Sequence, residues 1–307
     1  MAWDRAILTD SGGYQVFSLA PLRQVSDDGV IFRSHIDGSQ HLITPELAMQ
    51  FQEALGADII MVLDECPAYD DSFEKVSRAM SRTHQWAERC QKTQKRSDQA
   101  LYAIVQGGIF PQLRRQSAEH LTSLGFSGYA IGGLSLGEAK KITLTIIEET
   151  VALLPENKPR YLMGVGSPED LLEGIARGVD IFDSVLPTRV ARNGAFFTWQ
   201  GRHNIGNATY RQMEQPIDPD CDCYTCRTFS AAYLHHLFSC GELLAYRLAT
   251  IHNLNFISNL MRKVRSAIQN GTFNSLKDNF LSGYKPTDEQ TRLNQKRKWL
   301  KSRRLGA

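Results

Sequence analysis

Six short apolar runs, each followed by a polar or glycine-rich loop, divide the first 183 residues of the chain. The runs are AILTD ending at Asp10, ADIIMVLD at Asp64, LYAIVQGG at Gly108, GYAIGG at Gly133, RYLMGVG at Gly166 and VDIFD at Asp183. Apolar runs with so little polar interruption are typical of strands that are buried on both faces of a parallel sheet. Helical stretches lie between them, and this alternation predicts an α/β fold with an open sheet or a barrel.

The sequence contains start and stop signals for one of these helices. In SPEDLLEGIARG, Ser167 has the side chain of an N-cap residue and Pro168 suits the first turn. Asp170 can complete a capping box with Ser167, and Gly178 is a stop signal. The sequence therefore predicts a helix that begins at Pro168 and ends before Gly178.

Net charge is small but unevenly distributed. The 307 residues have a formal net charge of +2, yet the last 17 residues, TRLNQKRKWLKSRRLGA, hold seven Lys and Arg and no acid. The rest of the chain has 28 basic and 33 acidic residues, a net charge of −5. Nucleic-acid binding by this body therefore requires a local basic patch. The tail is either a solvated disordered segment or a source of long-range attraction for RNA.

Targeting signals and disulfides are not indicated. The N-terminus MAWDRAILTD lacks the basic-then-apolar pattern of a signal peptide, and the longest apolar runs are too short to span a bilayer. We therefore expect a cytoplasmic protein with no membrane partner. Three of the six cysteines fall within six residues, which favours a metal site over a disulfide framework.

These crowded cysteines form the pattern C-x-C-x2-C at Cys221, Cys223 and Cys226. Three thiolates need a fourth ligand to complete tetrahedral zinc. The candidates are His235, His236 and His252, and proximity in the sequence favours the His235/His236 pair. A Cys3His site has no open coordination position, so it would be structural, stabilising an insert too small for its own core.

Carboxylates end the first and the last of the six runs, at Asp10 and Asp183. In a closed sheet they would face each other, an arrangement that suits chemistry at an anomeric carbon: one carboxylate acts as nucleophile and the other handles protons. For a single aspartate after a strand, the alternative role is to cap the following helix. Here that alternative has to account for several polar strand ends at once.

The other strand ends carry groups that complement a flat ligand. Asp64 is an acceptor, Gln106 offers a donor and an acceptor, and Gly132 and Gly133 leave backbone N–H groups accessible. Together they could read a guanine-like edge.

Long motifs now make a family resemblance visible. They are LTDSGGYQVFS, DGSQHLITPE, LGADIIMVLDECP, VQGG, GYAIGGLSLGE, MGVGSPEDLLEGIARGVDIFDSVLPTR, and CDCYTC followed by TIHNL. With these motifs, which span about residues 1 to 284, the chain resembles bacterial tRNA-guanine transglycosylases, or queuine tRNA-ribosyltransferases. The resemblance implies a (β/α)8 TIM-type barrel and a pentosyltransferase. Such an enzyme exchanges the wobble guanine of tRNAs with a GUN anticodon for 7-aminomethyl-7-deazaguanine (preQ1) in queuosine biosynthesis.

The same resemblance implies roles for individual residues. Asp183 would be the nucleophile that holds the tRNA covalently, and Asp10 the proton acceptor. The base would contact Asp10, Ser11, Gly12, Gly13, Tyr14, Asp64, Gln106, Gly132, Gly133, Leu134 and Met163. The RNA would contact Gly164, Val165, Gly166, Ser167, Pro168, Glu169, Asp170, Thr188, Arg189, Val190, Ala191 and Arg192. One structural zinc ion would be held by Cys221, Cys223, Cys226 and His252, in place of the histidines that proximity favours.

Domain boundaries follow from the same comparison. We expect barrel units over residues 1–214, a zinc-binding insert over 215–253, a closing helical segment over 254–284 and a basic polar tail over 285–307. A homodimer is also implied.

The chain departs from the family pattern in three places. It begins within the helix before the third strand, so six strand-helix units are expected where the barrel has eight. Val190 stands where relatives often have a polar residue, and Gly206 replaces a usual arginine. A truncated, non-catalytic tRNA-binding or partner-subunit homologue is therefore the alternative, although the presence of Asp10, Asp64, Gln106 and Asp183 argues against loss of the chemistry.

Overall fold

The computed structural model describes residues 3–13, 23–34, 36–286, 288–290 and 293–294. The chain forms two compact units. The first comprises Met1–Met163, Arg177–Ile181 and Glu289–Ala307, and the second comprises Gly164–Ala176 and Phe182–Asp288. The expected base-contacting residues all belong to the first unit, whereas Asp183, the expected RNA-contacting residues and the cysteine cluster belong to the second.

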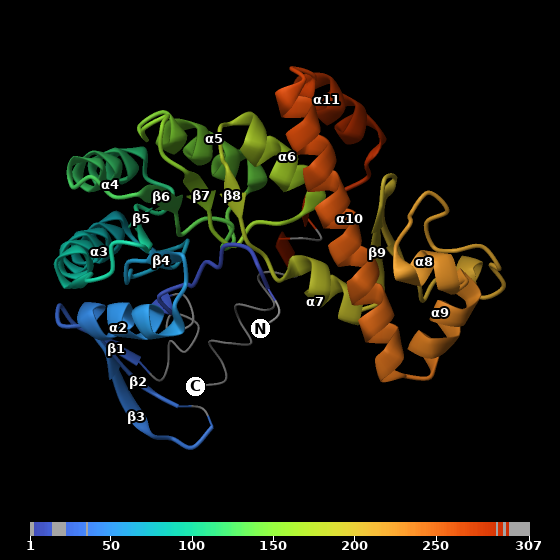
Figure 1. Ribbon diagram of the computed structural model, residues 1–307, viewed down its shortest axis with the longest axis horizontal. Helices are drawn as coiled ribbons and strands as arrows, with labels where there is room; N and C mark the ends of the chain where they lie inside the picture. Colours follow the sequence, from blue (N-terminus) through green and yellow to red (C-terminus); the bar gives the residue numbers. More distant parts are fainter. Residues whose placement is uncertain (1–2, 14–22, 35, 287, 291–292, 295–307) are drawn as a thin grey trace. The chain divides into compact units, whose positions relative to one another are not determined.

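Five strands form one curled sheet in the order β4-β5-β6-β7-β8 (Figure 1). They are β4 (Ile59–Met61), β5 (Ala100–Val105), β6 (Gly128–Ile131), β7 (Arg160–Leu162) and β8 (Ile181–Phe182). The pairs from β4 to β7 are parallel, and Leu8 adds a parallel bridge to Ile59 at the β4 edge. All six apolar runs thus contribute to this sheet or its edge, and the predicted α/β class is confirmed. The described strands do not reach the eight of a closed barrel.

The strands form where apolar side chains can be buried on both faces. All four residues of β6 are buried, and so are the last five of β5. Ile104, Val105 and Ile131 have no exposed surface at all. Continuous burial of this kind requires cover on both faces, which explains why these runs lack the alternating pattern of a half-exposed strand.

Helices α2 (Pro45–Leu55), α3 (Phe73–Thr93), α4 (Pro111–Ser123) and α5 (Lys140–Val151) belong to the first unit. Figure 1 shows α3, α4 and α5 side by side along one side of the sheet. Buried positions recur every three or four residues on each of them, as on any helix with one apolar face. On α4 this buried face includes the polar residues Arg114 and Ser117.

A small antiparallel sheet was not predicted from the sequence. Its strands are β1 (Arg23–Val25), β2 (Val30–Arg33) and β3 (Gln40–Ile43), in the order β1-β2-β3. Trp86 of α3 donates from its indole nitrogen to the Asp27 carbonyl in the β1–β2 turn, at 2.8 Å, and Arg89 donates to the same carbonyl at 2.9 Å. The turn is thereby fixed to α3.

The second unit is mostly helical. It contains α6 (Pro168–Ala176), α7 (Leu186–Arg192), β9 (Ala195–Thr198), β10 (Gly201–Asn204), the 3-10 helix η2 (Ala208–Tyr210), α8 (Tyr224–Thr228), α9 (Ala231–Ser239), α10 (Leu243–Gln269) and α11 (Phe273–Gly283). The predicted start of α6 is confirmed, because the Asp170 amide donates to Ser167 Oγ at 3.4 Å and Ser167 Oγ donates to the Asp170 carboxylate at 2.7 Å.

Helix α10 organises this unit. Its 27 residues contact α7, α8, α9, α11 and β9. Two apolar clusters form along it, one including Phe196, Leu234 and Leu248, the other including Phe197, Phe256 and Leu260. Among the described residues, no helix combines the length and the apolar character that crossing a bilayer would require.

Candidate active site and metal centre

Four expected base-contacting groups come together at the carboxyl ends of β4, β5 and β6. Gln106 Nε2 donates to Asp64 Oδ2 at 2.7 Å, and both residues are buried. Gly132 and Gly133 follow β6 directly beside the Gln106 amide, because a Cβ on either glycine would overlap Gln106 side-chain atoms. We call Gly13, Asp64, Gln106, Gly132 and Gly133 the strand-end cluster.

Close packing explains the glycines in this cluster. A Cβ on Gly13 would overlap Asp64 Oδ1 and would lie 2.7 Å from the Asp64 carbonyl oxygen. Gly133 also has a φ of 68°, in the left-handed region that favours glycine. Any larger residue at Gly13 or Gly133 would therefore displace Asp64 or Gln106.

The cluster and the neighbouring segment 10–13 contain polar atoms that the described residues do not satisfy. Gln106 Oε1 and Ser11 Oγ are buried and have no hydrogen-bond partner in the described part of the chain. A buried polar atom without a partner costs free energy, on the order of 1–3 kcal/mol. A ligand with complementary donors would remove this cost, which is what a binding site for a polar, flat molecule needs.

Asp64 has a strongly shifted ionisation. Burial raises the pKa of the Asp64 carboxyl to about 7, and the negative charge of Asp10 acts in the same direction. The hydrogen bond from Gln106 partly opposes both effects. Asp64 can consequently change between acid and carboxylate near neutral pH, as residues of active sites often do.

The remaining expected base contacts lie in the same unit. Asp10 follows the Leu8 bridge at the sheet edge, and its Oδ1 accepts a hydrogen bond from the Ser11 amide at 2.9 Å. Leu134 is buried after β6 and Met163 is half-buried after β7. Gly12 adopts a φ of 90°, and Tyr14 lies outside the described residues.

Asp183 is exposed directly after β8, in the second unit. Its Oδ1 accepts a hydrogen bond from the Gly164 amide at 2.8 Å. The segment 164–166 lies against this strand end, since a Cβ on Gly166 would overlap the Ser184 side chain. This backbone hydrogen bond fixes the orientation of an exposed carboxylate at the end of the strand.

The two expected RNA-contacting segments have exposed and buried members. In α7, Arg189 and Arg192 are exposed and Thr188 is half-exposed, whereas Val190 and Ala191 are buried in the apolar clusters of the second unit. Residues 188–192 form most of this helix. In the other segment, Gly164 is exposed, Ser167, Glu169 and Asp170 are half-exposed, and Val165, Gly166 and Pro168 are buried.

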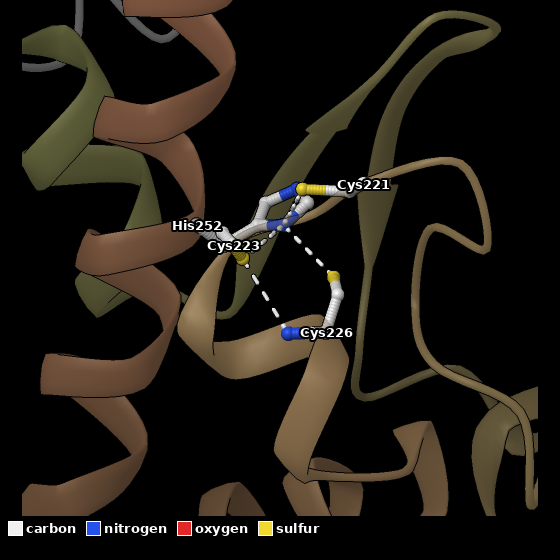
Figure 2. A group of neighbouring side chains, drawn as sticks. All are labelled: Cys221, Cys223, Cys226 and His252. Carbon is white, nitrogen blue, oxygen red and sulfur yellow. Dashed lines mark hydrogen bonds between the residues drawn. The ribbon is translucent and has the colours of Figure 1, made fainter.

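Three cysteines and one histidine form a potential metal centre (Figure 2). The Sγ atoms of Cys221, Cys223 and Cys226 lie 3.6, 3.7 and 3.3 Å from His252 Nδ1, and all four ligand atoms fall within 4.8 Å of one another. Cys223 also caps α8, accepting a hydrogen bond from the Cys226 amide. Three soft thiolates and one imidazole are the donor set of structural zinc sites, so the residues fit that metal.

The histidines that proximity favoured are not part of this centre. His235 and His236 both lie on α9, where their rings contact Ser239 and Cys240 respectively. His252 reaches the cysteines from α10 because that long helix runs alongside α8. Sequence distance was misleading since the chain turns back between the two helices.

Interactions around His252 connect the metal centre to α7. His252 Nε2 donates to the Phe197 carbonyl at 2.7 Å, which leaves Nδ1 as the metal-facing nitrogen. Its neighbour Asn253 is fully buried, accepts from the Phe197 amide at 2.9 Å and donates to the Pro187 and Ala195 carbonyls at 3.0 and 2.9 Å. Asn253 was missed in the sequence, although it lies within the TIHNL motif.

Comparisons with known proteins agree with this arrangement. The sequence model of the queuine tRNA-ribosyltransferase family matches residues 1–286. A queuine tRNA-ribosyltransferase of Dehalococcoides mccartyi (strain ATCC BAA-2100 / JCM 16839 / KCTC 5957 / BAV1) is 64% identical over 300 residues, 98% of this chain and 76% of that protein. Proteins of the same name from Halothermothrix orenii and Moorella thermoacetica are 55% and 54% identical, each over 92% of this chain and 76% of their own length. The chain belongs to the queuine tRNA-ribosyltransferase family.

Proposed function

We propose that this protein is a tRNA-guanine transglycosylase that works through a covalent tRNA intermediate. The observation that carries the proposal is the strand-end cluster, in which a buried aspartate and a buried amide pack against three glycines at the carboxyl ends of the strands. Ionised Asp64 can accept two N–H groups of a guanine-type edge, while Gln106 and the Gly133 N–H can donate to its carbonyl oxygen. The match to the family supports the same assignment.

The chemistry divides between two carboxylates. Asp183 attacks C1′ of the wobble ribose, the bond to guanine breaks, and the base departs with the electron pair of that bond. Asp10 accepts a proton from the incoming base, which then attacks C1′ and displaces Asp183. The wobble base must first leave its stack, because the enzyme cannot reach C1′ of a stacked nucleotide otherwise.

Further details belong to the same proposal. The incoming base is preQ1, whose aminomethyl group meets the Leu134 carbonyl, and the RNA substrates are tRNAs with a GUN anticodon. Exposed Arg189 and Arg192 provide planar donor groups for bases and phosphates beside the wobble position. The active protein is a homodimer, and the fold is a (β/α)8 TIM-type barrel, of which this chain supplies six strand-helix units.

A zinc ion completes the Cys3His centre in this proposal. Cys221, Cys223, Cys226 and His252 would hold it, leaving no coordination position for a substrate. The ion would cross-link the segment around α8 to α10 and would take no part in the reaction.

The ionisation of Asp64 leads to a pH prediction. Guanine should bind more tightly as the pH rises from 6 to 8, because ionised Asp64 accepts the N–H groups of the base and its pKa lies at about 7. Well below this pKa the affinity should fall by up to about tenfold per pH unit. Titration calorimetry with guanine at several pH values measures this effect, and Asp64→Asn should flatten the profile. A profile that is flat in the unmodified protein would contradict the assignment.

The same shift has an opposite consequence for folding. The folded-state pKa of Asp64 is raised above the ordinary value of 3.8, so between about pH 4 and 7 the folded protein binds more protons than the unfolded one. Rising pH therefore costs stability through this window, while it improves binding of the base. A site that gives up stability for function is expected where a carboxylate must be buried.

A further inference from the structure

Helix α4 directs two polar side chains into the core beneath the strand-end cluster. Arg114 is 1% exposed and Ser117 is fully buried. Lysine and arginine are almost never buried to this degree without a specific partner. The negative charge of buried Glu138 acts on Arg114, but no carboxylate among the described residues lies within 4.0 Å of its guanidinium, whose hydrogen bonds go to three backbone carbonyls.

These carbonyls lie at the end of β5 and in the loops after β5 and β6, next to Gln106 and Gly133. Arg114 Nε donates to the Gly108 carbonyl at 2.9 Å and Nη1 to the Val105 carbonyl at 2.8 Å. Nη2 donates to the Gly132 carbonyl at 2.8 Å. One guanidinium thus links the end of β5, the loop after it and the loop after β6, and holds them at a fixed separation.

The bond to Gly132 determines where the next N–H points. In a trans peptide the carbonyl and the following N–H point in opposite directions. Since Arg114 draws the Gly132 carbonyl toward α4, the Gly133 N–H is turned away from α4. Gly133 makes this possible through its positive φ of 68°.

Both polar groups of the peptide between Val105 and Gln106 make hydrogen bonds to α4. Its carbonyl, from Val105, accepts from Arg114, while its N–H, from Gln106, donates to Ser117 Oγ at 3.2 Å. Arg114 and Ser117 are three residues apart on α4 and therefore project from the same face. Ser117 Oγ is in turn 3.0 Å from His84 Nε2 of α3, which fixes the hydroxyl.

Burying an arginine in the core costs free energy that an apolar side chain would not cost. A buried charge loses its hydration, and an apolar side chain of similar volume would avoid that loss. What the guanidinium adds is three charge-assisted hydrogen bonds in one rigid plane, which a lysine ammonium cannot reproduce. This geometry fixes the orientation of the peptide groups that accept these hydrogen bonds.

We propose that Arg114, assisted by Ser117, is a positioning residue that orients Gln106 and the Gly133 N–H toward the carbonyl oxygen of the bound base. The proposal rests on the base-binding role of the strand-end cluster given above. Arg114 touches neither base nor RNA, so it controls affinity and selectivity for the base and leaves affinity for tRNA unaltered.

Arg114→Lys tests this because it keeps the charge but removes the planar arrangement of donors. We expect the Kd for free guanine to rise by at least about tenfold, the loss of one hydrogen bond to a charged group. The preference for guanine over 2-aminopurine, which lacks both the carbonyl oxygen and the N1–H, should shrink by a similar factor. Binding of tRNA should change by less than about twofold. Ser117→Ala, which removes only the partner of the Gln106 N–H, should produce a smaller change of the same kind.

Two controls separate orientation from general destabilisation. Arg115→Gln changes the neighbouring exposed arginine of α4. It should leave the Kd for guanine, the preference over 2-aminopurine and the affinity for tRNA unchanged. Leu121→Ala removes a fully buried side chain from the same helix, so it lowers the melting temperature without touching the carbonyls. It should keep the preference for guanine over 2-aminopurine.

The outcomes are distinct. Failure of the unmodified protein to bind guanine would remove the proposed function and this inference together. If the unmodified protein binds guanine and folded Arg114→Lys keeps both its affinity and its preference over 2-aminopurine, the inference alone is overturned. An equal loss of preference in Leu121→Ala would also overturn it, because destabilisation would then explain the effect. Should Arg114→Lys not fold, Ser117→Ala decides by the same two measurements.

Discussion

Asp183→Asn should eliminate the covalent tRNA adduct and lower the rate of base exchange by at least about 10³-fold. An amide is a poor nucleophile toward C1′, and no other group in the proposal can replace the carboxylate. The Gly164 N–H that now donates to Asp183 Oδ1 could still donate to the amide oxygen, so the fold around position 183 should persist. The adduct is measured on a denaturing gel after mixing protein, tRNA and no free base.

Asp180→Asn is the matched control. It removes the same charge three residues earlier, from an exposed carboxylate that accepts a hydrogen bond from the Arg160 amide at 2.9 Å. Exchange should remain within about threefold of the unmodified rate, as for most surface substitutions away from a site.

Asp10→Asn should slow exchange but still allow an adduct, since the nucleophile remains. An adduct that persists in Asp183→Asn and maps to Asp10 would reverse the two roles.

His252→Ala should release the metal and unfold the region around α8. Metal binding to a Cys3His site contributes on the order of 10 kcal/mol to the folding of a small domain, and one ligand in four cannot be lost without a large part of that. Elemental analysis of the purified protein measures the effect: we expect one zinc ion per chain before the change and close to none after it. A chelator should reproduce the loss of structure in the unmodified protein.

The consequence should extend beyond the cysteines. His252 Nε2 donates to the Phe197 carbonyl, and Asn253 donates to the carbonyls of Pro187 in the first turn of α7 and Ala195 at the start of β9. Loss of the metal should therefore increase hydrogen exchange in residues 186–198 as well as in α8. His235→Ala and His236→Ala, on α9, should keep the zinc. If either releases it while His252→Ala does not, the ligand set is wrong.

The main sheet could be predicted from the sequence because its strands leave an unambiguous pattern. Ile59–Met61, Ala100–Val105 and Gly128–Ile131 are buried on both faces, so their apolar runs are uninterrupted and stand out from the helices between them. The small β1-β2-β3 sheet could not be recognised this way. Its strand Gln40–Ile43 has three exposed residues out of four, so burial imposes almost no pattern on it.

The candidate site residues also differ in how clearly the sequence shows them. Asp10, Asp64 and Asp183 were found because a carboxylate after an apolar run is conspicuous. Arg114 was missed because a basic residue in an amphipathic helical stretch normally faces solvent, and only the structure shows the carbonyls that hold it. The fourth metal ligand was ambiguous for a related reason: sequence distance favoured the His235/His236 pair, but three-dimensional proximity depends on the path of the chain between α9 and α10.

The central claim is that this protein exchanges the wobble guanine of tRNA for a free base. The most direct measurement is incorporation of labelled guanine into a tRNA with a GUN anticodon, beside the same tRNA with adenine at the wobble position. We predict label in the first tRNA only, released again by an excess of unlabelled preQ1. Two results would contradict the claim. One is that a folded protein that carries zinc and binds guanine puts no label into the tRNA with a GUN anticodon. The other is equal label in both tRNAs.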